Sequence, residues 1–261
     1  MKDKHTFAIC AYKESPYLER VIEALMKQTV QSNIIMCTST PCEYISNMAE
    51  KYNIPLYVRD GASDIRDDWN FAYDQSKTKF VTIAHQDDEY HEEYASNLKA
   101  MIEKYNGEFL MFYTGYKPIK DGQVVTDINC RIRRFLRWPM KVKAFNRVRW
   151  IKKLTLSMGN SICCPAATYN KEQLGNSMFT SDMKFNIDWD TLYKLAGLKG
   201  RFAYVDKTLT YYRVHDGATS KEFIDNSGRV VEDTAMFEKF WPGWVARLIM
   251  VFYKKAYDTY S

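Results

Sequence analysis

The feature that most constrains the fold is a regular alternation of strand-like and helix-like stretches through residues 5–105. Short apolar runs rich in strand formers are separated by segments whose apolar residues recur at helical spacing. The runs span residues 5–10, 33–37, 56–58 and 80–84, and the helical segments span 16–25, 42–52, 67–76 and 91–105. This order predicts an α/β fold in which helices cover both faces of a largely parallel central sheet. At the first helix we expect Ser15 as the N-cap and Pro16 at the first helical position.

The second half continues this pattern less regularly. Apolar runs predict strands at 109–114, 161–169, 201–205 and 209–215, a helix over 188–196, and helical periodicity through 231–260. We expect one domain over residues 1–220, divided near residue 115, and a C-terminal helical tail over 221–261. The tail is expected to pack on the domain, to assist binding to a membrane surface, or to pair with a second subunit in a homodimer.

Length and composition exclude several classes of protein. A chain of 261 residues that is 46% hydrophobic buries a substantial core, and its 11 Gly and 7 Pro exclude collagen-like and low-complexity chains. No stretch reaches the roughly 18 apolar residues of a membrane-spanning helix. The apolar run near the N-terminus is too short for a signal peptide, so we expect a cytoplasmic protein. The six cysteines show no CxxC pair, and free thiols are expected.

The positive charge is concentrated in one segment. Residues 131–153 hold ten Lys and Arg and no acid, whereas the rest of the chain has 27 basic against 32 acidic residues. Large apolar side chains such as Phe135, Trp138 and Trp150 are interleaved with these charges. Such a basic-aromatic segment suits an anionic membrane surface or a phosphate-bearing partner. The alternative is a solvated excursion with some aromatic packing.

Adjacent carboxylates follow the strand predicted at 80–84, in the sequence Ala84-His85-Gln86-Asp87-Asp88. The carboxyl ends of parallel strands border the ligand crevice of an open sheet. Two neighbouring acids repel each other unless a cation or a hydrogen-bond donor relieves them, and their oxygens suit Mg²⁺ or Mn²⁺. The alternative is that one of the two acids caps the helix that follows.

The late strand carries Tyr211, Arg213 and His215 at alternating positions, so their side chains share one face. A guanidinium and an imidazole side by side suit phosphate oxygens, and His215 could also ligate a metal. A structural, hydrogen-bonded role is the alternative for His215.

Two further motifs lie at predicted helix starts. Asp188 and Asp190 open the helix at 188–196, where positions two apart diverge by roughly 200°, so both cannot face one site. One could act as a base while the other stabilises the helix N-terminus. In the second motif, Gly61 precedes a helix that carries Trp69 and Asn70, where the backbone could approach a phosphate or a sugar.

Taken in this order, the motifs resemble those of the inverting glycosyltransferases of family 2, which have the GT-A fold. The likeness covers nearly the whole chain. It implies that residues 1–115 are the donor half, with a Rossmann-like nucleotide-binding fold, and that residues 116–220 are the acceptor half. The matching segments are 6–15 (opening strand and Tyr-containing turn), 69–72 (helix before the metal motif), 84–88 (Asp-x-Asp region), 187–190 (base motif) and 212–215 (late diphosphate strand).

The resemblance implies a reaction and a set of site residues. A sugar would move from a nucleotide-diphosphate sugar, with UDP-sugars favoured, to an acceptor hydroxyl, with Asp188 as the base and Asp190 as the fallback. Mn²⁺ or Mg²⁺ would be held by Asp87, Asp88 and His215. The donor-binding positions would be Ala11, Tyr12, Glu14, Ser39, Gly61, Asp64, Trp69, Asn70, Gln86 and Arg213.

The basic-aromatic segment adds an expectation about the acceptor. It points to a lipid-linked saccharide at the inner face of the cell membrane, in cell-surface polysaccharide synthesis, and no nucleic acid is expected as a partner.

The sequence departs from the family pattern at three places. His85 stands at the first acid of Asp-x-Asp, so Asp87 would carry most of the metal contact. Thr38-Ser39-Thr40 replaces the acids usual after the second strand, which leaves base recognition to a hydroxyl or the backbone. Ile187 replaces the glutamate of the base motif, which leaves Asp188 as the match.

Two other functions fit part of the sequence. A sugar-phosphate nucleotidyltransferase uses a similar sheet and metal, but its Gly-rich loop after the first strand is absent from residues 11–16 here. A non-catalytic basic-aromatic module for RNA or membrane would explain residues 131–153 and would leave the clustered carboxylates without a purpose.

Overall fold

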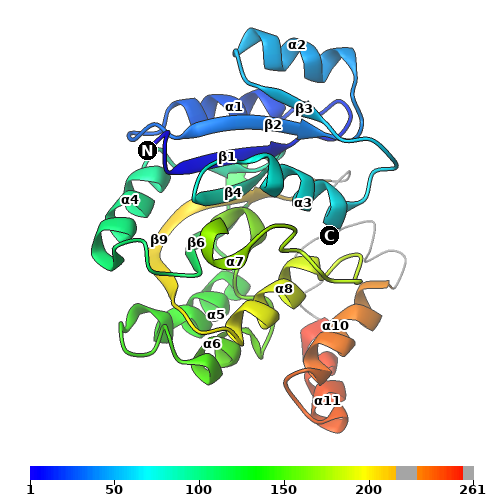
Figure 1. Cartoon of the computed structure of the whole chain (residues 1–261). Helices are drawn as coiled ribbons and strands as arrows, with labels where there is room; N and C mark the ends of the chain where they lie inside the picture. Colours follow the sequence, from blue (N-terminus) through cyan, green and yellow to red (C-terminus); the bar gives the residue numbers. More distant parts are fainter. Residues whose placement is uncertain (216–227, 255–261) are drawn as a thin grey trace.

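The computed structural model describes residues 1–215 and 228–254 as one curled mixed sheet with helices on both faces (Figure 1). The expected class, an α/β fold with a largely parallel central sheet flanked by helices, is confirmed. The sheet order is β3-β2-β1-β4-β8-β6-β9-β5, and β7 pairs with β6. Its strands are β1 (His5–Cys10), β2 (Asn33–Thr38), β3 (Leu56–Val58), β4 (Phe80–His85), β5 (Glu89–Tyr90), β6 (Met111–Lys120), β7 (Gln123–Val124), β8 (Ala167–Asn170) and β9 (Phe202–Arg213).

The strands β3, β2, β1 and β4 are parallel, and the alternation of side chains along them explains the two covered faces. Phe7 and Ile9 of β1 belong to one apolar cluster, and Ala8, between them, belongs to the other. The first cluster contains the apolar stripe of α1 (Leu18–Met26), together with residues of α2 (Glu43–Lys51) and α4 (Tyr94–Tyr105). The second contains residues of α3 (Ile65–Gln75) and α8 (Ile187–Ala196).

The second half of the sheet is mixed. The strand β8 lies antiparallel between β4 and β6, so it joins the parallel half to the rest of the sheet. Where the sequence predicts one strand over 161–169, residues 164–166 form a short 3-10 turn, and only residues 167–170 pair. Pro165 stands inside that turn, and proline cannot donate a ladder hydrogen bond.

The two strands predicted at 201–205 and 209–215 are one strand, β9. It runs parallel to β6 and accommodates its polar middle through register shifts around Gly115. A Cβ at Gly115 would lie 2.8 Å from the carbonyl oxygen of Lys207, so a glycine is needed for this close approach.

The helix boundaries correct two predictions. The first helix begins at Leu18, not at Pro16, and Ser15 is not its N-cap; the Ser15 hydroxyl accepts a hydrogen bond from the backbone N–H of Tyr17, within the preceding turn. The third helix begins at Ile65 rather than 67, because the Asp64 carboxylate accepts from the N–H groups of Arg66 and Asp67.

The C-terminal periodicity belongs to two helices, α10 (Gly228–Glu238) and α11 (Gly243–Tyr253). Met236 and Phe237 of α10, with Ala246 and Met250 of α11, are buried in the same cluster as the residues of α3 and α8. The boundary expected between residues 220 and 221, and the parts of the expected tail at 221–227 and 255–261, lie outside the described residues.

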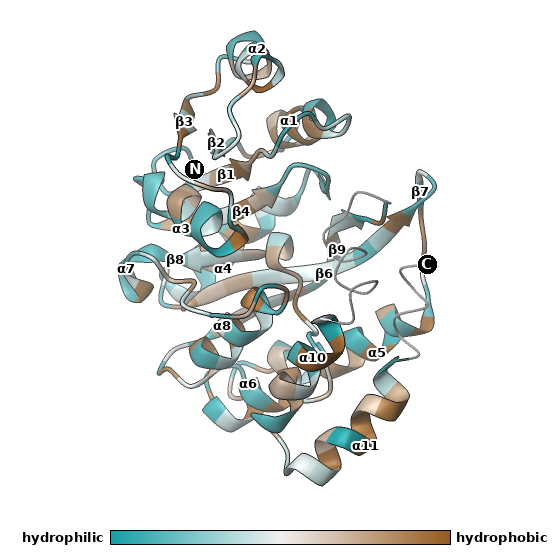
Figure 2. Cartoon of the chain, turned by 90° about the vertical axis from the view of Figure 1, so that its right-hand side faces the viewer, coloured by the Kyte–Doolittle hydropathy of each residue, from teal (hydrophilic) through white to brown (hydrophobic). Residues whose placement is uncertain are grey.

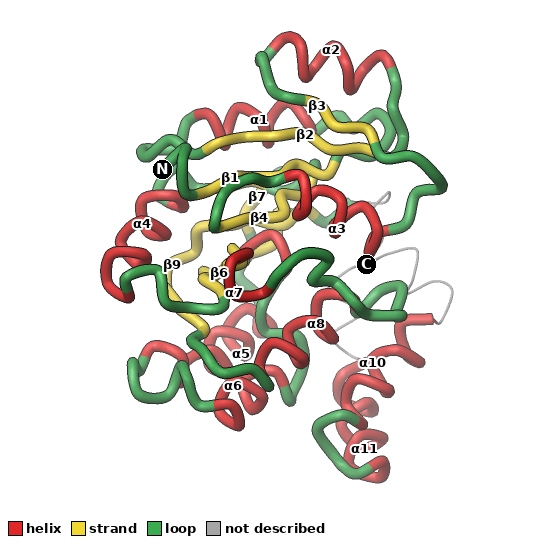
Figure 3. The backbone as a smooth tube through the Cα atoms, in the orientation of Figure 1, coloured by secondary structure: helices red, strands yellow, loops and turns green. Residues whose placement is uncertain are grey.

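The basic segment forms most of α5 (Ile128–Arg137), a 3-10 turn at Trp138–Lys141, and the start of α6 (Arg149–Leu156). Two of its cations are internal. Arg137 donates to the carbonyl of Ser161, and the Lys152 ammonium donates to the carbonyls of Leu198 and Gly200 at 2.8 and 3.0 Å. The tube view in Figure 3 shows these helices at the end of the molecule opposite α2.

Within the described part of the chain, no helix combines the length and the apolar character needed to cross a bilayer. All six cysteines are free thiols.

Candidate metal and donor site

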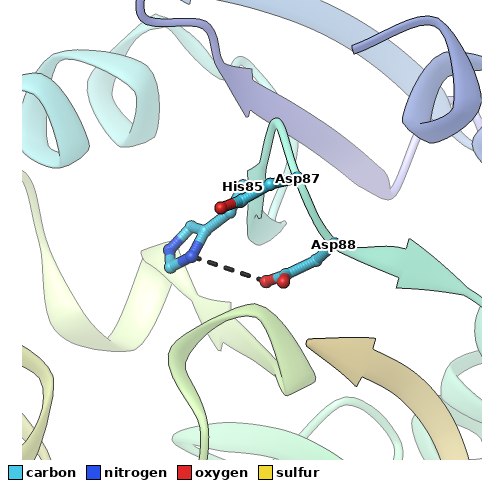
Figure 4. A group of neighbouring side chains, drawn as sticks. All are labelled: His85, Asp87 and Asp88. Atoms are coloured by element: carbon cyan, nitrogen blue, oxygen red, sulfur yellow. Dashed lines mark ion pairs between the residues drawn. The ribbon is translucent and has the colours of Figure 1, made fainter. Parts of the chain in front are cut away.

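Three potential ligands meet just beyond the carboxyl end of β4. Figure 4 shows His85, Asp87 and Asp88 around one point, and one ligand atom of each lies within 4.8 Å of the others. The His85 Nδ1 is 3.5 Å from a carboxylate oxygen of Asp88. Asp88 is only 3% exposed, whereas the side chains of His85 and Asp87 remain partly accessible. The adjacent acids therefore lie where the strand-end pattern predicts them.

The end of β9 completes this cluster. The His215 Nε2 is hydrogen-bonded to a carboxylate oxygen of Asp87 at 3.0 Å. The Arg213 backbone N–H donates to Asp88 at 3.0 Å, and its Nε donates to the Asp87 carbonyl at 3.1 Å. Its Nη2 pairs with Glu89, and the guanidinium lies over the Tyr17 ring. Nε and Nη2 of Arg213 are thus directed at the protein itself. Arg213 therefore fixes the position of the loop that carries Asp87, Asp88 and Glu89.

The charges of the cluster are unbalanced without a cation. Burial, and then the neighbouring charge of Asp87, raise the pKa of Asp88 well above its usual range. Burial opposes ionisation of Asp87 too, but the hydrogen bond with His215 and the nearby imidazoles lower its pKa. In addition, the buried Nε2 of His85 has no hydrogen-bond partner. Two carboxylates and an imidazole fit a divalent cation, and the nitrogen donor suits Mn²⁺ better than Mg²⁺.

The predicted donor-binding residues on the opening turn lie beside this cluster. Gln86 exchanges two hydrogen bonds with the Tyr12 backbone, at 2.8 and 2.9 Å, and Tyr12 is 45% exposed. Ala11 is buried and donates its N–H to Cys37 at the end of β2. Glu14 is exposed.

The motif around α3 divides into two groups. Trp69 stacks on the His85 ring, with 5.2 Å between centroids and 23° between planes, so it borders the metal cluster. Asn70 instead exchanges hydrogen bonds with the backbone of Phe179 at 2.8 and 2.9 Å. Asp64 caps α3 and pairs with Lys184 at 3.0 Å. Asn70 and Asp64 thus fix the loop before α8, while Gly61 lies exposed in the left-handed region at φ +96°.

Three residues of a polar network at the ends of β2 and β3, namely Asp68, Arg59 and Ser63, are absent from the sequence-based assignment. The Asp68 carboxylate accepts from the hydroxyls of Ser39 and Ser63, at 2.9 and 2.8 Å, and from the Nε of Arg59 at 2.8 Å. An acid from α3 therefore stands next to the hydroxyl that replaces the usual acids after the second strand. The run Asp67-Asp68 in the sequence could have indicated the role of Asp68, whereas no sequence pattern indicated Arg59.

Asp188 and Asp190 have different surroundings, as their spacing predicts. Asp188 accepts hydrogen bonds from the Asn160 amide at 2.8 Å and from the Trp189 N–H at 2.7 Å. Burial raises the pKa of Asp188 to about 6, even though these hydrogen bonds favour the charged form. Asp190 is buried, pairs with Lys194 at 2.8 Å, and forms a second ion pair with Lys239, just beyond α10. Asp190 therefore attaches α8 to the C-terminal helices.

Asp188 and the metal cluster share one region of the molecule. The thiol of Cys163 lies close enough to both for its pKa to rise through burial and then through the charges of Asp88 and Asp188. The site therefore combines a candidate cation cluster, a partly buried carboxylate with a raised pKa, and an exposed aromatic ring at the opening turn. Asn160, which orients Asp188, carries no sequence signal because it is 28 residues away and lies in a loop.

The sequence matches no protein-family profile, and no curated protein sequence is significantly similar to it. Solved structures with the same fold do exist. TarS 1–349 from S. aureus in complex with UDP superimposes with a TM-score of 0.59 at 18% identity, covering 95% of this chain and 69% of that chain. TarS 1–349 in complex with UDP-GlcNAc gives 0.56 at 14% identity, covering 99% and 73%.

A mannosyltransferase from Pyrobaculum calidifontis, in complex with GDP-Man and Mn²⁺, gives a TM-score of 0.59 at 13% identity, covering 90% of this chain and 63% of that chain. These neighbours share a GT-A-like fold with the present chain.

Proposed function

We propose that this chain is a metal-dependent inverting glycosyltransferase that moves a sugar from a nucleotide-diphosphate sugar to an acceptor hydroxyl. The observation that carries the proposal is the cluster of His85, Asp87 and Asp88 at the carboxyl end of β4. That cluster occurs in a fold whose solved neighbours include complexes with UDP-GlcNAc and with GDP-Man and Mn²⁺. The assignment to family 2 is part of the same proposal.

The donor would lie along the ends of β1, β2 and β4. The exposed Tyr12 ring is proposed to contact the base, with Ser39 and its partner Asp68 close by. His215, hydrogen-bonded to Asp87, is proposed to face the diphosphate or the cation. Arg213 holds Asp87 and Asp88 in place through its backbone N–H and Nε. A UDP-sugar is the donor that we favour.

The three clustered side chains would hold a divalent cation, Mn²⁺ in preference to Mg²⁺. A bound cation of this type neutralises the negative charge that grows on a departing diphosphate. Neighbouring side chains would keep these ligands in position: Trp69 packs against His85, and His215 orients the Asp87 carboxylate.

Asp188 is the proposed base. Its carboxylate would take the proton from the acceptor hydroxyl, whose oxygen then bonds to the anomeric carbon as the bond to the diphosphate oxygen breaks. A nucleoside diphosphate leaves, and the anomeric configuration inverts. Asn160 donates to the Asp188 carboxylate and fixes its orientation.

We also propose that residues 1–115 form the donor half, residues 116–220 form the acceptor half, and 221–261 form a helical tail. The proposed acceptor is a saccharide, lipid-linked, used in cell-surface polysaccharide synthesis at the cytoplasmic face of the membrane.

A thermal-shift panel of UDP, GDP and their sugars, with and without Mn²⁺, tests the proposal, followed by product analysis. We expect one nucleotide sugar to stabilise the protein only with Mn²⁺, and free nucleoside diphosphate to be released. Asp87→Asn is expected to abolish the Mn²⁺-dependent part of the shift, whereas Asp182→Asn, at a fully exposed side chain, leaves it unchanged. Release of pyrophosphate would indicate a nucleotidyltransferase instead, and salt-sensitive RNA binding without any shift would indicate a binding module.

A further inference from the structure

Helix α5 has its apolar stripe on the outside. Ile128, Ile132 and Phe135 recur at helical spacing and are exposed, Phe135 by 77%, whereas Arg137 is buried. A helix of a globular domain normally places its apolar stripe against the core. The outward stripe of α5 is therefore a candidate contact surface for an apolar partner.

Two other helices have the same arrangement. On α6, Trp150 and Leu154 are exposed and lie four residues apart, and Met158, two residues beyond the helix, continues the same spacing. On α11 the exposed stripe runs from Trp244 through Leu248 to Val251 and Phe252. The tryptophans at 150 and 244 are 66% and 67% exposed.

The three helices gather at one end of the molecule. Figures 1 and 2, which view the chain from two perpendicular directions, both show α5, α6 and α11 at the end opposite α2. The Trp241 indole, just before α11, donates to the carbonyl of Ser157 at 2.8 Å. The Tyr253 ring of α11 lies against Gly159, where a Cβ would be only 2.9 Å away. We call the exposed stripes of α5, α6 and α11 the three-helix surface.

The segments that carry these stripes contain basic residues and no acidic ones. Residues 128–158 and 243–254 contain no Asp or Glu. Exposed cations in these stretches include Arg131, Lys143, Arg147, Arg149 and Arg247. Arg134 and Lys141 share one acid, Asp206 of β9, and the other cations have no acid on their own segments.

We propose that the three-helix surface binds the surface of an anionic phospholipid bilayer. Exposed Trp, Phe, Leu and Ile would enter the boundary between headgroups and acyl chains, and the flanking Lys and Arg would meet anionic headgroups. A second copy of the chain fits this surface poorly, because a symmetric dimer pairs each patch with itself and would bring two basic surfaces together. This inference stands apart from the transfer reaction, since it needs neither donor nor cation.

The position of α5 connects this surface with the candidate site. The side of α5 opposite the exposed stripe carries Arg137, whose guanidinium lies over the Tyr116 and Tyr204 rings. Arg137 also donates to the carbonyl of Ser161, and the neighbouring Asn160 donates to the Asp188 carboxylate at 2.8 Å. An acceptor held in the bilayer would therefore be presented beside the proposed base, a step that rests on the proposed function.

Flotation of the full chain with phosphatidylcholine vesicles, with and without phosphatidylglycerol, tests the proposal. We expect binding to the anionic vesicles and quenching of native Trp fluorescence by lipids brominated on their acyl chains. A variant with Phe135→Ser, Trp150→Ser and Trp244→Ser is expected to lose vesicle binding. Its matched control changes three exposed apolar residues elsewhere, Met26, Val58 and Val231, to Ser, and is expected to bind like the wild type.

The contribution of the basic residues is tested separately, with two double variants that change the net charge equally. Lys143→Glu with Arg147→Glu is expected to lower partitioning into anionic vesicles about tenfold or more. Lys27→Glu with Lys99→Glu makes the same change in net charge on α1 and α4 and is expected to have little effect.

Several results would overturn the proposal: equal partitioning into neutral and anionic vesicles, equal losses in the two charge variants, or unquenched Trp fluorescence. A dimer in sedimentation equilibrium that the triple variant dissociates would show that a second copy covers the surface. Donor-induced thermal shifts, measured on every variant, separate these results from a failure of the proposed reaction.

Discussion

Asp188 has the chemical properties that a general base at neutral pH requires. Its raised pKa comes mainly from burial, so the carboxylate is charged at neutral pH but holds a proton more readily than an exposed aspartate. The Asn160 amide fixes one carboxylate oxygen and the Trp189 N–H fixes the other. Substitution at this position should therefore affect the chemical step and leave donor binding intact.

Asp188→Asn removes the proton acceptor while keeping the size of the side chain. We expect kcat for sugar transfer to fall by about 10²- to 10⁴-fold, while the donor-induced thermal shift stays as in the wild type. Asp182→Asn, on the loop before α8 and fully exposed, serves as the control and should transfer at the wild-type rate. A near wild-type rate in Asp188→Asn would show that another group takes the proton.

The pH dependence of the reaction follows from the same carboxyl group. Because its pKa is raised to about 6, it takes up a proton as the pH falls through 6, and the protonated form cannot act as a base. We expect kcat/KM, measured with saturating Mn²⁺, to be level above about pH 7 and to fall about tenfold per pH unit well below 6. Circular dichroism at each pH verifies that the chain stays folded, and a flat profile down to pH 5 would contradict the assignment.

At the scale of elements, α10 fixes the backbone that leads into α8. The Glu232 carboxylate accepts hydrogen bonds from three successive backbone N–H groups, of Lys184, Phe185 and Asn186. Its neighbour Asp233 accepts from the Asn186 side-chain amide at 2.7 Å. These contacts lie directly before Asp188, so α10 positions the proposed base from a distance.

Glu232→Ala leaves the three N–H groups without this acceptor. We expect the free energy of unfolding to fall by about 2 kcal/mol, because hydrogen bonds to charged groups are worth roughly 1.5–3 kcal/mol, and kcat to fall more than donor affinity. Glu238→Ala, an exposed position on the same helix, is the matched control. Chemical denaturation measures the free energy of unfolding of each variant. Equal free energies for the two variants would show that Glu232 does not stabilise the backbone before α8.

The elements also show what the sequence could reveal. The strands β1 to β4 and the helices α1 to α4 were predictable because each has a clear local periodicity, and the acid pair was predictable because it directly follows β4. The two-residue strand β5 was not predicted, because it is too short to show a periodic pattern. The continuity of β9 was not, because Asp206 and Lys207 break the apolar pattern and only the pairing with β6 carries the strand past them. Glu232 was out of reach for a similar reason, since its partners lie 46–48 residues away.

At the scale of the whole molecule, α10 and α11 contribute to the apolar core around α3 and α8. Met236, Phe237, Ala246 and Met250 are buried against residues of α3 and α8, and Lys239 pairs with the buried Asp190. The helical tail expected from the sequence is therefore packed on the domain through these residues. Its outer face remains available for other contacts.

A chain that ends at residue 227 should consequently be much less stable than one that ends at residue 254. We expect a loss of roughly 5 kcal/mol or more, because a fully buried Phe or Met contributes about 1.5–3 kcal/mol, which is a large share of the usual 5–15 kcal/mol. Thermal unfolding of the two truncated chains measures the difference. Equal melting temperatures would show that the described C-terminal helices do not contribute to the stability of the core.

The insertion of β8 between β4 and β6 has a consequence for biosynthesis. The parallel strands β3, β2, β1 and β4 are complete once residue 85 has left the ribosome, yet the strand that covers the outer edge of β4 is made only at residues 167–170. During that interval the nascent chain presents an unpaired strand edge, which is prone to association with other chains. We therefore expect this protein to depend on chaperones or slow dilution to refold, since closure of its sheet waits for a distant segment.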